Sequence, residues 1–452
     1  MASQKITSKS SDPSFIKRVD IISNKTGQSV SVMGGLVNLS YYESILKDSV
    51  RATITFVDAG NSINDKTVLD GLPIVGEERV YVKFADHNEN TLDFGDALEN
   101  HMYVNRVTPL SDDTTRSIVQ IELSSKEFIL NEKVRLNNRF DGKISEHVNR
   151  ILTDKNYLHT LKKVDIEATS NNYNFIGNNR KPYYTLNWLS KNSVSSENQK
   201  KGSSAGYFFF ETFEGFKFKS IDGLLSQEKK KSIIYNQSPD TRGQNIPEGY
   251  EMKALQYSKD NAIDVQMKLQ MGAFSTRTVL FDPFNCDYKV ITPTAEKKKG
   301  SYKTAGKDLP KLNDEFNRSG YNKEFSRTTY MLLDRGSLPT GGGEGKGNEQ
   351  VKKSGEQNFE PQEILNQSIM RYNQLYSQQS TITIPGDYSL HAGDVIFLDV
   401  PELQKDTKND DINKQNGGLY IIADLCHYIT PNETYTKLNL VRDSFGRTGN
   451  HS

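Results

Sequence analysis

Alternating hydrophobic and polar residues dominate the chain from Phe15 to Lys126. In the stretch RATITF, the apolar Ala52, Ile54 and Phe56 alternate with arginine and threonine. A period of two places one set of side chains on the buried face of a β-strand and the other set in solvent. The pattern recurs, with turn-forming clusters between, in VDIIS, SVSVM, VYVKF, HMYVNRV and SIVQIEL. Short strands separated by turns predict a sandwich or a barrel.

The period changes after this region. Residues 141–154 place Ile144, Val148, Ile151 and Leu152 at helical spacing, which predicts an amphipathic helix.

Further elements are expected downstream. A second helix is predicted at 184–190, a hairpin with its turn at Glu214-Gly215 over 207–224, alternating strands over 250–280, and a helix at 361–378. The segments TITI, DVIFLDV, LYIIADL and TKLNLV predict closing strands.

Residues 291–358 are rich in lysine and glycine and poor in apolar side chains. Such a composition predicts a long, partly mobile surface excursion, with short ordered pieces such as TTYMLLD.

The closing strands repeat the spacing of the first ones, which favours a duplicated barrel over coincidence. We expect Ile54 and its neighbours to have counterparts in the second barrel. The nearly constant offset pairs Tyr103 with Tyr420, Leu123 with Leu440, and Val82 with Leu398.

The composition of the chain argues against several classes of protein. Lys+Arg and Asp+Glu both number 57, so the net charge is zero, which argues against a protein that grips nucleic acid electrostatically. No apolar run approaches the roughly 20 residues of a membrane span, and the N-terminus does not resemble a signal peptide. We interpret Cys286 and Cys426 as buried free thiols in a reducing compartment, so synthesis in the cytosol is expected.

No motif predicts catalysis, and we expect no catalytic, cofactor-binding or metal-binding residue. The glycine-rich 341–347 lacks the serine or threonine of a phosphate loop and is better interpreted as a linker. The seven histidines are scattered, which argues against a zinc site. Cys426 and His427 are neighbours on an expected strand, so their side chains should diverge, with the cysteine in the core and the histidine at the surface.

Charged runs are expected to be solvated. These are the acidic pairs Glu77-Glu78 and Asp112-Asp113 and the EKKK runs at 228–231 and 296–299.

Four stretches together resemble the central baseplate hub proteins of contractile-tailed (myovirus) bacteriophages. They are LSYYESILKDSVRATITFVDAG, LDGLPIVGEERVYVKF, RKPYYTLNWLSKNSV with YFFFETFEGFKFKSIDGL, and GDYSLHAGDVIFLDVP with GLYIIADLCHYI and TYTKLNLVRD. The resemblance covers most of the chain except 291–358.

The resemblance implies an α+β, mainly β fold, with two related antiparallel β-barrels and an intervening α/β domain. The expected division is 14–128 for the first barrel, 129–248 with 283–377 for the α/β domain including the flexible insertion at about 291–358, and 249–282 with 378–445 for the second barrel.

The resemblance also implies a role and partners. The expected protein is a structural component of the virion, located in the tail baseplate and assembled in the host cytoplasm. As a homotrimeric, pseudo-sixfold ring it would join the tail tube or tube-initiator proteins to the central spike, inside the surrounding wedge proteins. It would enclose the passage for the tape-measure protein and for DNA, which is only transient cargo, and would not insert into a membrane.

Two alternatives stay open. One is a tail-associated enzyme that degrades cell wall or glycan, which would need a carboxylate pair or metal cluster in a cleft. The other is the hub of a related contractile injection machine, such as a tailocin or a secretion system.

Overall fold

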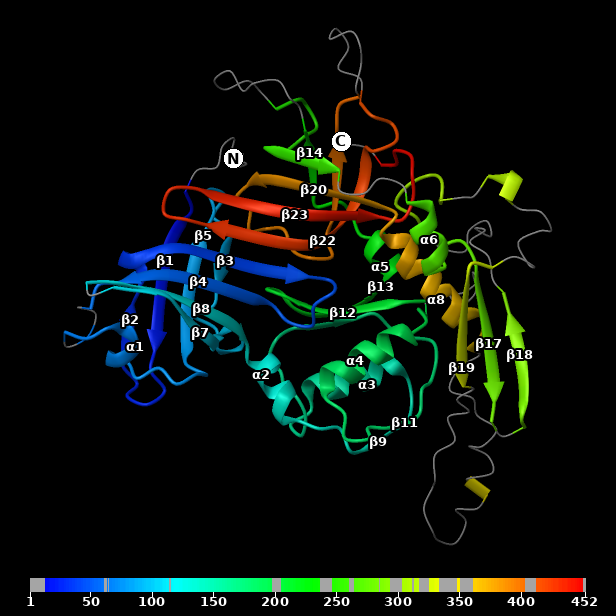
Figure 1. Ribbon diagram of the computed structural model, residues 1–452, viewed down its shortest axis with the longest axis horizontal. Helices are drawn as coiled ribbons and strands as arrows, with labels where there is room; N and C mark the ends of the chain where they lie inside the picture. Colours follow the sequence, from blue (N-terminus) through cyan, green and yellow to red (C-terminus); the bar gives the residue numbers. More distant parts are fainter. Residues whose placement is uncertain are drawn as a thin grey trace, which may run out of the picture.

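The computed structural model shows a mainly β protein whose described strands lie chiefly in one large sheet (Figure 1). None of the helices in the described part of the chain has the length and hydropathy of a membrane span. The structure describes residues 13–449 except 61–62, 64, 114, 197–204, 236–245, 260–263, 284, 293–302, 311–312, 317–324, 333–347, 350–360 and 403–411.

The first β unit consists of the alternating segments near the N-terminus, as the sequence predicts. Its elements are β1 (Phe15–Ile22), β2 (Ser29–Ser31), η1 (Met33–Gly35), β3 (Leu36–Ser44), β4 (Arg51–Asp58), α1 (Val68–Gly71), β5 (Arg79–Ala85), β6 (Thr91–Asp93), η2 (Leu98–Asn100), β7 (Met102–Asp112) and β8 (Ser117–Ser125). Strands pair in the order β2-β1-β5-β7-β8-β4-β3, all antiparallel, and β6 lies beside β5. Because β2 and β3 belong to one segment, 29–44, this segment borders both ends of the order.

The second β unit has the same kind of order. Its strands are β14 (Lys231–Ile234), β15 (Met252–Lys253), β16 (Gln256–Lys259), β20 (Gln378–Pro385), β21 (Val395–Asp399), β22 (Gly418–Ile429) and β23 (Thr434–Arg442). They pair in the order β15-β14-β21-β22-β23-β20-β16, and β15 and β16 again belong to one segment, 252–259. The difference is that β14 runs parallel to β15 and β21, whereas the other pairs are antiparallel.

The pairing registers of the two units also agree. Both β7 and β22 carry a bulge at the same place relative to the next strand, which identifies the equivalent positions. On the inward faces, the register matches Ile54 with Ile382, Val80 with Ile396, Met102 with Tyr420, and Leu123 with Leu440.

One expected pairing is wrong by a single residue. Tyr103 pairs with Arg79 as Ile421 pairs with Val395, so its counterpart is Ile421 and not Tyr420. A slip of one residue turns a strand position to the opposite face. Tyr103 accordingly points away from the core of the first unit, whereas Tyr420 helps to fill the core of the second unit.

A central α/β unit follows the first β unit. Its elements are α2 (Lys126–Lys133), β9 (Arg139–Phe140), α3 (Ile144–Thr153), β10 (Val164–Ile166), β11 (Phe175–Ile176), α4 (Pro182–Lys191), β12 (Tyr207–Thr212), β13 (Gly215–Ser220) and α5 (Ile221–Leu225). The predicted helices and hairpin are confirmed, and the predicted apolar face of α3 is fully buried. At the hairpin turn, a Cβ on Gly215 would lie 2.1 Å from the Lys163 carbonyl oxygen, and its φ is +128°. Only glycine fits this turn.

A small sheet and two helices lie at the far end of the molecule from β2 and α1 (Figure 1). They are α6 (Val265–Met271), β17 (Thr276–Asp282), β18 (Asp287–Ile291), η4 (Asp314–Phe316), β19 (Arg327–Leu332) and α8 (Pro361–Leu375). The expected helix at 361–378 is confirmed over 361–375, and the ordered piece TTYMLLD is confirmed as far as Leu332, beyond which it lies outside the described residues.

The expected strand at 265–271 is wrong, because α6 is a helix. The Asp264 side chain accepts a hydrogen bond from the Met267 backbone N–H at 2.9 Å, and Gly272 ends the helix in the left-handed conformation. These caps override the short alternating pattern. Residues 276–282 pair with β18 and β19 rather than with the second β unit.

The two β units differ in what covers them. A core of inward side chains fills each unit, but the second unit is buried on its outward face as well. There, side chains of β12, α5 and α8 pack against Val395, Ile421 and Val441. Burial on both faces explains why β21 is a continuous apolar run instead of an alternating one.

Candidate functional site

The two β units are joined edge to edge by β3 and β22. These strands pair antiparallel from Ser44 opposite Asp424 to Leu39 opposite Ile429. The joint, which we call the seam, makes one continuous sheet of both units. Because a sheet edge left open is prone to non-specific pairing, the seam also protects the outer edge of β3, which ends the order of the first unit.

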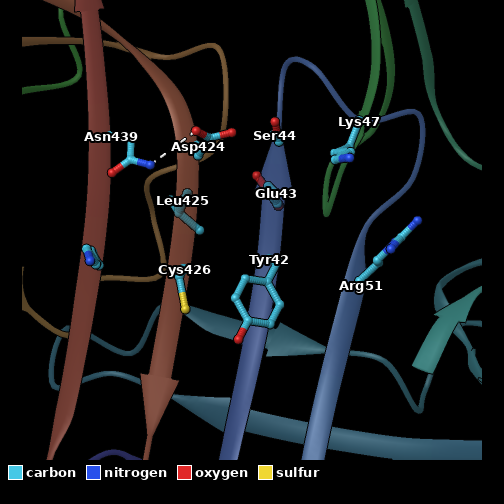
Figure 2. A pocket seen from close by; sticks show the side chains of 10 residues that line it. Tyr42, Glu43, Ser44, Lys47, Arg51, Asp424, Leu425, Cys426 and Asn439 are labelled. Carbon is cyan, nitrogen blue, oxygen red and sulfur yellow. Dashed lines mark hydrogen bonds between the residues drawn. The ribbon is translucent and has the colours of Figure 1, made fainter. Parts of the chain in front are cut away.

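A shallow pocket of about 390 Å³ lies on the outward face of the seam (Figure 2). Asp424 accepts a hydrogen bond from the Asn439 side chain at 3.2 Å, and Lys47 and Arg51 stand on the β3–β4 side. Burial raises the pKa of the Cys426 thiol to about 11, so the thiol stays protonated near neutral pH. The pocket therefore offers no thiolate nucleophile. Its lining residues are Tyr42, Glu43, Ser44, Lys47, Arg51, Asp424, Leu425, Cys426, Lys437 and Asn439.

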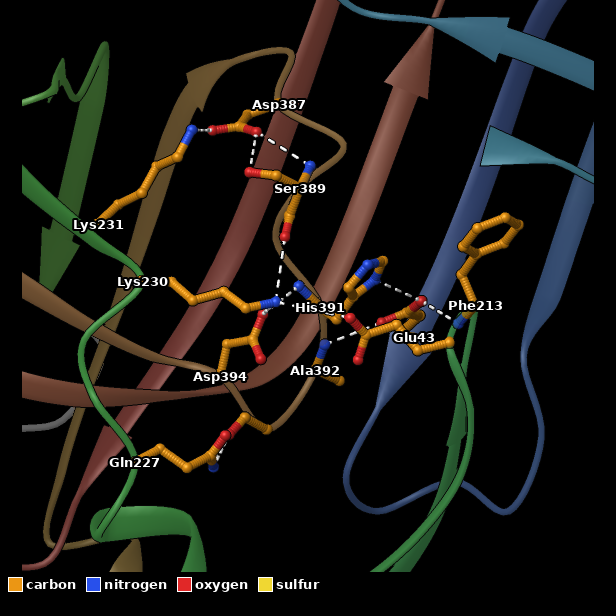
Figure 3. A network of polar contacts seen from close by, with 12 residues as sticks. Glu43, Phe213, Gln227, Lys230, Lys231, Asp387, Ser389, His391, Ala392 and Asp394 are labelled. Carbon is orange, nitrogen blue, oxygen red and sulfur yellow. Dashed lines mark hydrogen bonds and ion pairs between the residues drawn. The ribbon is translucent and has the colours of Figure 1, made fainter. Parts of the chain in front are cut away.

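The inward side of the seam carries a buried carboxylate, Glu43 (Figure 3). It accepts hydrogen bonds from the Tyr41 hydroxyl at 2.9 Å and from the backbone N–H groups of Phe213 and Ala392 at 2.8 and 2.9 Å. The His391 ring nitrogen Nδ1 lies 3.1 Å from the same carboxylate. Glu43 thus connects the first β unit, the β12–β13 turn and the loop before β21.

Charge and hydrogen bonding hold Glu43 ionised. Burial alone would raise its pKa, but the neighbouring His391 and the two backbone donors lower the pKa to about 2. Conversely, burial lowers the pKa of His391, but the Glu43 charge outweighs burial and raises it. The pair is therefore a buried ion pair with further hydrogen bonds, the arrangement in which removing one partner is strongly destabilising.

Two lysines of the 228–231 run hold the same loop. Lys231 pairs with the buried Asp387, and Lys230 Nζ lies 2.9 Å from Asp394 (Figure 3). Asp394 also accepts a hydrogen bond from the His391 backbone N–H at 2.8 Å. The expectation that this run is a solvated loop is wrong for Lys231, which begins β14 and pairs with a buried aspartate, whereas Lys230 is exposed as expected while its ammonium reaches Asp394.

Two further buried charge clusters tie the units together. Lys162 lies between Glu127 and Glu211, and Glu211 also accepts hydrogen bonds from the Val50 backbone N–H at 3.1 Å and the Ser125 hydroxyl at 2.9 Å. Burial lowers the pKa of Lys162, but the two glutamates raise it further than burial lowers it. This cluster joins the first β unit to the central unit.

The second cluster is centred on Arg371 of α8. Its guanidinium donates to Asp222 at 2.9 Å and to Asp443 at 2.7 Å, and all three side chains are buried. Asp222 lies in α5 of the central unit, and Asp443 follows β23 of the second β unit. The cluster therefore fixes α8 against these two units.

These clusters are joints rather than reaction centres. The carboxylates of the clusters are paired with a cation, and Lys162 and Arg371 are each shared by two of them. Burial raises the pKa of Glu211, but its carboxylate is held by Lys162, the Val50 backbone N–H and the Ser125 hydroxyl. Within the described residues, no group of three or more His, Cys, Asp and Glu side chains is arranged to hold a metal.

Comparison with known proteins relates the chain to phage tail proteins. The chain is similar to a probable baseplate hub protein, gp334, of Vibrio phage KVP40, with 23% identity over 424 residues that cover 92% of this chain and 91% of the relative. The predicted resemblance to phage baseplate hub proteins is confirmed. It supports a structural role in a phage tail baseplate. No family model matches the chain.

A solved tail protein shares the fold. The tail protein from Neisseria meningitidis MC58 superposes with a TM-score of 0.51 at 8% identity, over 94% of this chain and 96% of that chain. The 43 kDa tail protein of prophage MuSo2 from Shewanella oneidensis superposes with a TM-score of 0.49 at 10% identity, over 94% of this chain and 98% of that one.

The expected cysteine–histidine arrangement is half right. The side chains diverge, but His427 is the buried member, packed between the Tyr41 and Tyr388 rings, and Cys426 is half-exposed. Burial lowers the pKa of His427 to about 3, so this ring stays neutral. Cys286 is exposed rather than buried, and both thiols are free.

The other charged motifs include both buried and exposed residues. Glu78 is fully buried and accepts hydrogen bonds from the Val75 and Gly76 backbone N–H groups, so the expectation of a solvated residue is wrong. Asp112 is exposed at the end of β7. The runs at 341–347 and 296–299 lie outside the described residues.

The sequence did not predict that Glu43 and His391 form a buried pair. One signal was available, since Glu43 falls on the inward side of a strand that also turns Leu39 and Tyr41 inward. An acidic residue at such a position requires buried partners.

Proposed function

We propose that the chain is the central hub of a phage tail baseplate and that it works as a homotrimeric ring. The observation that carries this proposal is the shared pairing order and register of the two β units. A chain with two equivalent units offers six similar surfaces when three copies assemble. Such a ring would match a sixfold tube on one side and a threefold spike on the other.

We further propose that each β unit closes as a barrel. The segments 29–44 and 252–259 each border both ends of a pairing order, which supports closure through a bent strand. In this proposal 14–128 forms the first barrel, and 378–445 with 252–259 and β14 forms the second. The α/β domain takes most of 129–248 and 283–377.

The proposed partners follow from the hub role. The ring joins the tail tube or tube-initiator proteins to the central spike, contacts the wedge proteins, and surrounds the passage for the tape-measure protein and for DNA as transient cargo. The proposed location is the virion baseplate, after assembly in the host cytoplasm. The buried charge clusters favour a mechanical role over a catalytic one, because their charged side chains form ion pairs and hydrogen bonds that hold the units together.

Electron microscopy of the purified full-length protein tests the proposal. We expect rings with threefold symmetry and six similar lobes around a central opening. Particles that stay monomeric at about 100 μM, or rings whose lobes do not number six, would contradict it.

A further inference from the structure

The small sheet presents an apolar face that nothing in the described structure covers. In one cross-strand row Tyr288, Phe281 and Leu332 stand opposite one another, and in the next row Val290, Val279 and Tyr330 do so. Residues opposite or two apart share a face of a sheet. Tyr330 is 80% exposed, Leu332 70% and Tyr288 67%. We call these six side chains the small-sheet face.

The opposite face of this sheet is already used. Thr276, Thr278 and Leu280 are buried there, and β17 contacts α8. A three-stranded sheet with one packed face has no structural need for large aromatic and aliphatic side chains on the other. A contiguous apolar surface of this kind marks an interaction site.

The chain itself has little to cover this face. The adjoining segments 293–302, 317–324, 333–347 and 350–360 contain few large apolar residues among glycine, lysine and polar residues, namely Tyr302, Tyr321, Leu333, Leu338, Val351 and Phe359. Their spacing fits neither an apolar strand face nor an apolar helix face. The occupant must therefore come from another chain.

The opposite end of the molecule exposes a second apolar set. Met33 in η1, Val37 in the β3 bulge and Leu110 in the β7 bulge are 42%, 41% and 53% exposed. Between these bulges, the paired Val57 and Ile118 bridge β4 and β8. We call these five residues the bulge patch.

We propose that the small-sheet face of one copy packs against the bulge patch of a neighbouring copy. The inference rests on the proposed ring. In Figure 1 the small sheet and the end that carries β2 and α1 lie at opposite ends of the longest axis. A contact between two different patches is head-to-tail, and a head-to-tail contact closes into a ring when the rotation permits. Closure covers both apolar sets on every copy.

Complementary variants of the full-length chain test the contact. Leu332→Asp disables the small-sheet face and Leu110→Asp disables the bulge patch. Each variant alone should sediment as a monomer, with the dissociation constant of the assembly raised at least about 30-fold. A mixture of the two should form a one-to-one dimer and nothing larger, because only one competent pair of surfaces remains. Leu98→Asp, at a similarly exposed leucine outside both patches, should assemble like the unmodified chain.

Each outcome has a distinct meaning. If the unmodified chain forms trimers and Leu332→Asp does too, the contact is wrong while the hub proposal stands. If Leu332→Asp dissociates but Leu110→Asp does not, the small-sheet face meets a different surface, and the inference is overturned. If the unmodified chain never self-associates, the contact and the ring both fail. Circular dichroism confirms folding, and Leu332→Ser and Leu110→Ser replace any aspartate variant that unfolds.

Discussion

The two β units share their pairing order, but their outward faces meet different surroundings. In β5, the outward Arg79, Tyr81 and Lys83 are exposed or half-exposed, whereas their counterparts Val395, Phe397 and Asp399 in β21 are buried. The inward residues are apolar in both strands. Register is thus set by the inward face, and the outward composition follows whatever covers the strand.

The largest expected effect compares two equivalent outward positions. Phe397→Ala should lower the free energy of unfolding by about 3–5 kcal/mol, because it opens a cavity in a fully buried position. Tyr81→Ala should lower it by only about 1 kcal/mol, because that ring is half-exposed. Urea denaturation followed by circular dichroism measures both. Equal losses would show that the outward face of β21, where Lys229 and Arg447 lie over the Phe397 ring, is not covered as described.

The next effect concerns the joint between the units. Glu43→Gln should lower the free energy of unfolding by about 3 kcal/mol, because a buried protonated His391 loses its counter-charge. The matched control, Glu99→Gln in the exposed η2, should stay within about 0.5 kcal/mol of the unmodified chain. A loss no larger than that of the control would mean that His391 is neutral in the folded protein.

The same pair predicts a pH dependence with two limbs. The folded pKa of Glu43, about 2, lies below the ordinary value of 4.5, so acidification through this interval removes up to about 3 kcal/mol of stability. The folded pKa of His391 lies above its ordinary 6.5. Its contribution is complete below about pH 6.5 and is lost as the pH rises through the folded value.

Urea denaturation across about pH 2–9 measures these limbs. His391→Gln should remove the alkaline limb, since the variant has no imidazole to titrate at this position. An unchanged alkaline limb in that variant would assign the dependence to a group other than His391.

The smallest expected effect concerns outward positions that are uncovered in both β units. Glu122 in β8 and Asn439 in β23 occupy equivalent outward positions, and both are exposed or nearly so. Glu122→Ala and Asn439→Ala should each change the free energy of unfolding by less than about 0.5 kcal/mol. A large loss at only one of them would indicate an unrecognised cover on that unit.

Local patterns carried most of the prediction. Alternation located the strands of the first unit, and helical spacing located α3 and its four buried apolar residues, because these patterns depend only on neighbours in the sequence. The counterpart of Tyr103 was misplaced because the offset between equivalent positions changes from strand to strand. It is 396 − 80 = 316 between β5 and β21 but 420 − 102 = 318 between β7 and β22, and a constant offset of 317 therefore fails in β7. The helix α6 was missed although Asp264 and Gly272 marked its ends.

The charge clusters could not be predicted in the same way. Glu43 and His391 lie 348 residues apart in the sequence, and their contact exists only because β3 pairs with β22. The burial of His427 has the same origin, since its ring packs against Tyr41 from the neighbouring unit. A single sequence reveals such partners only as a charge or ring on an inward strand position.

The seam has a mechanical consequence. A force that slides the two β units past each other along β3 and β22 loads every hydrogen bond of that strand pair at once. A force that pulls the units apart sideways from one end breaks the bonds one after another. The joint is therefore stiff in shear and weak in peeling, and Glu43, buried on the inward side one residue from the Ser44 end of the seam, adds ionic contacts against peeling from that end. A chain built this way withstands thrust along its strands far better than a transverse tug at its edge.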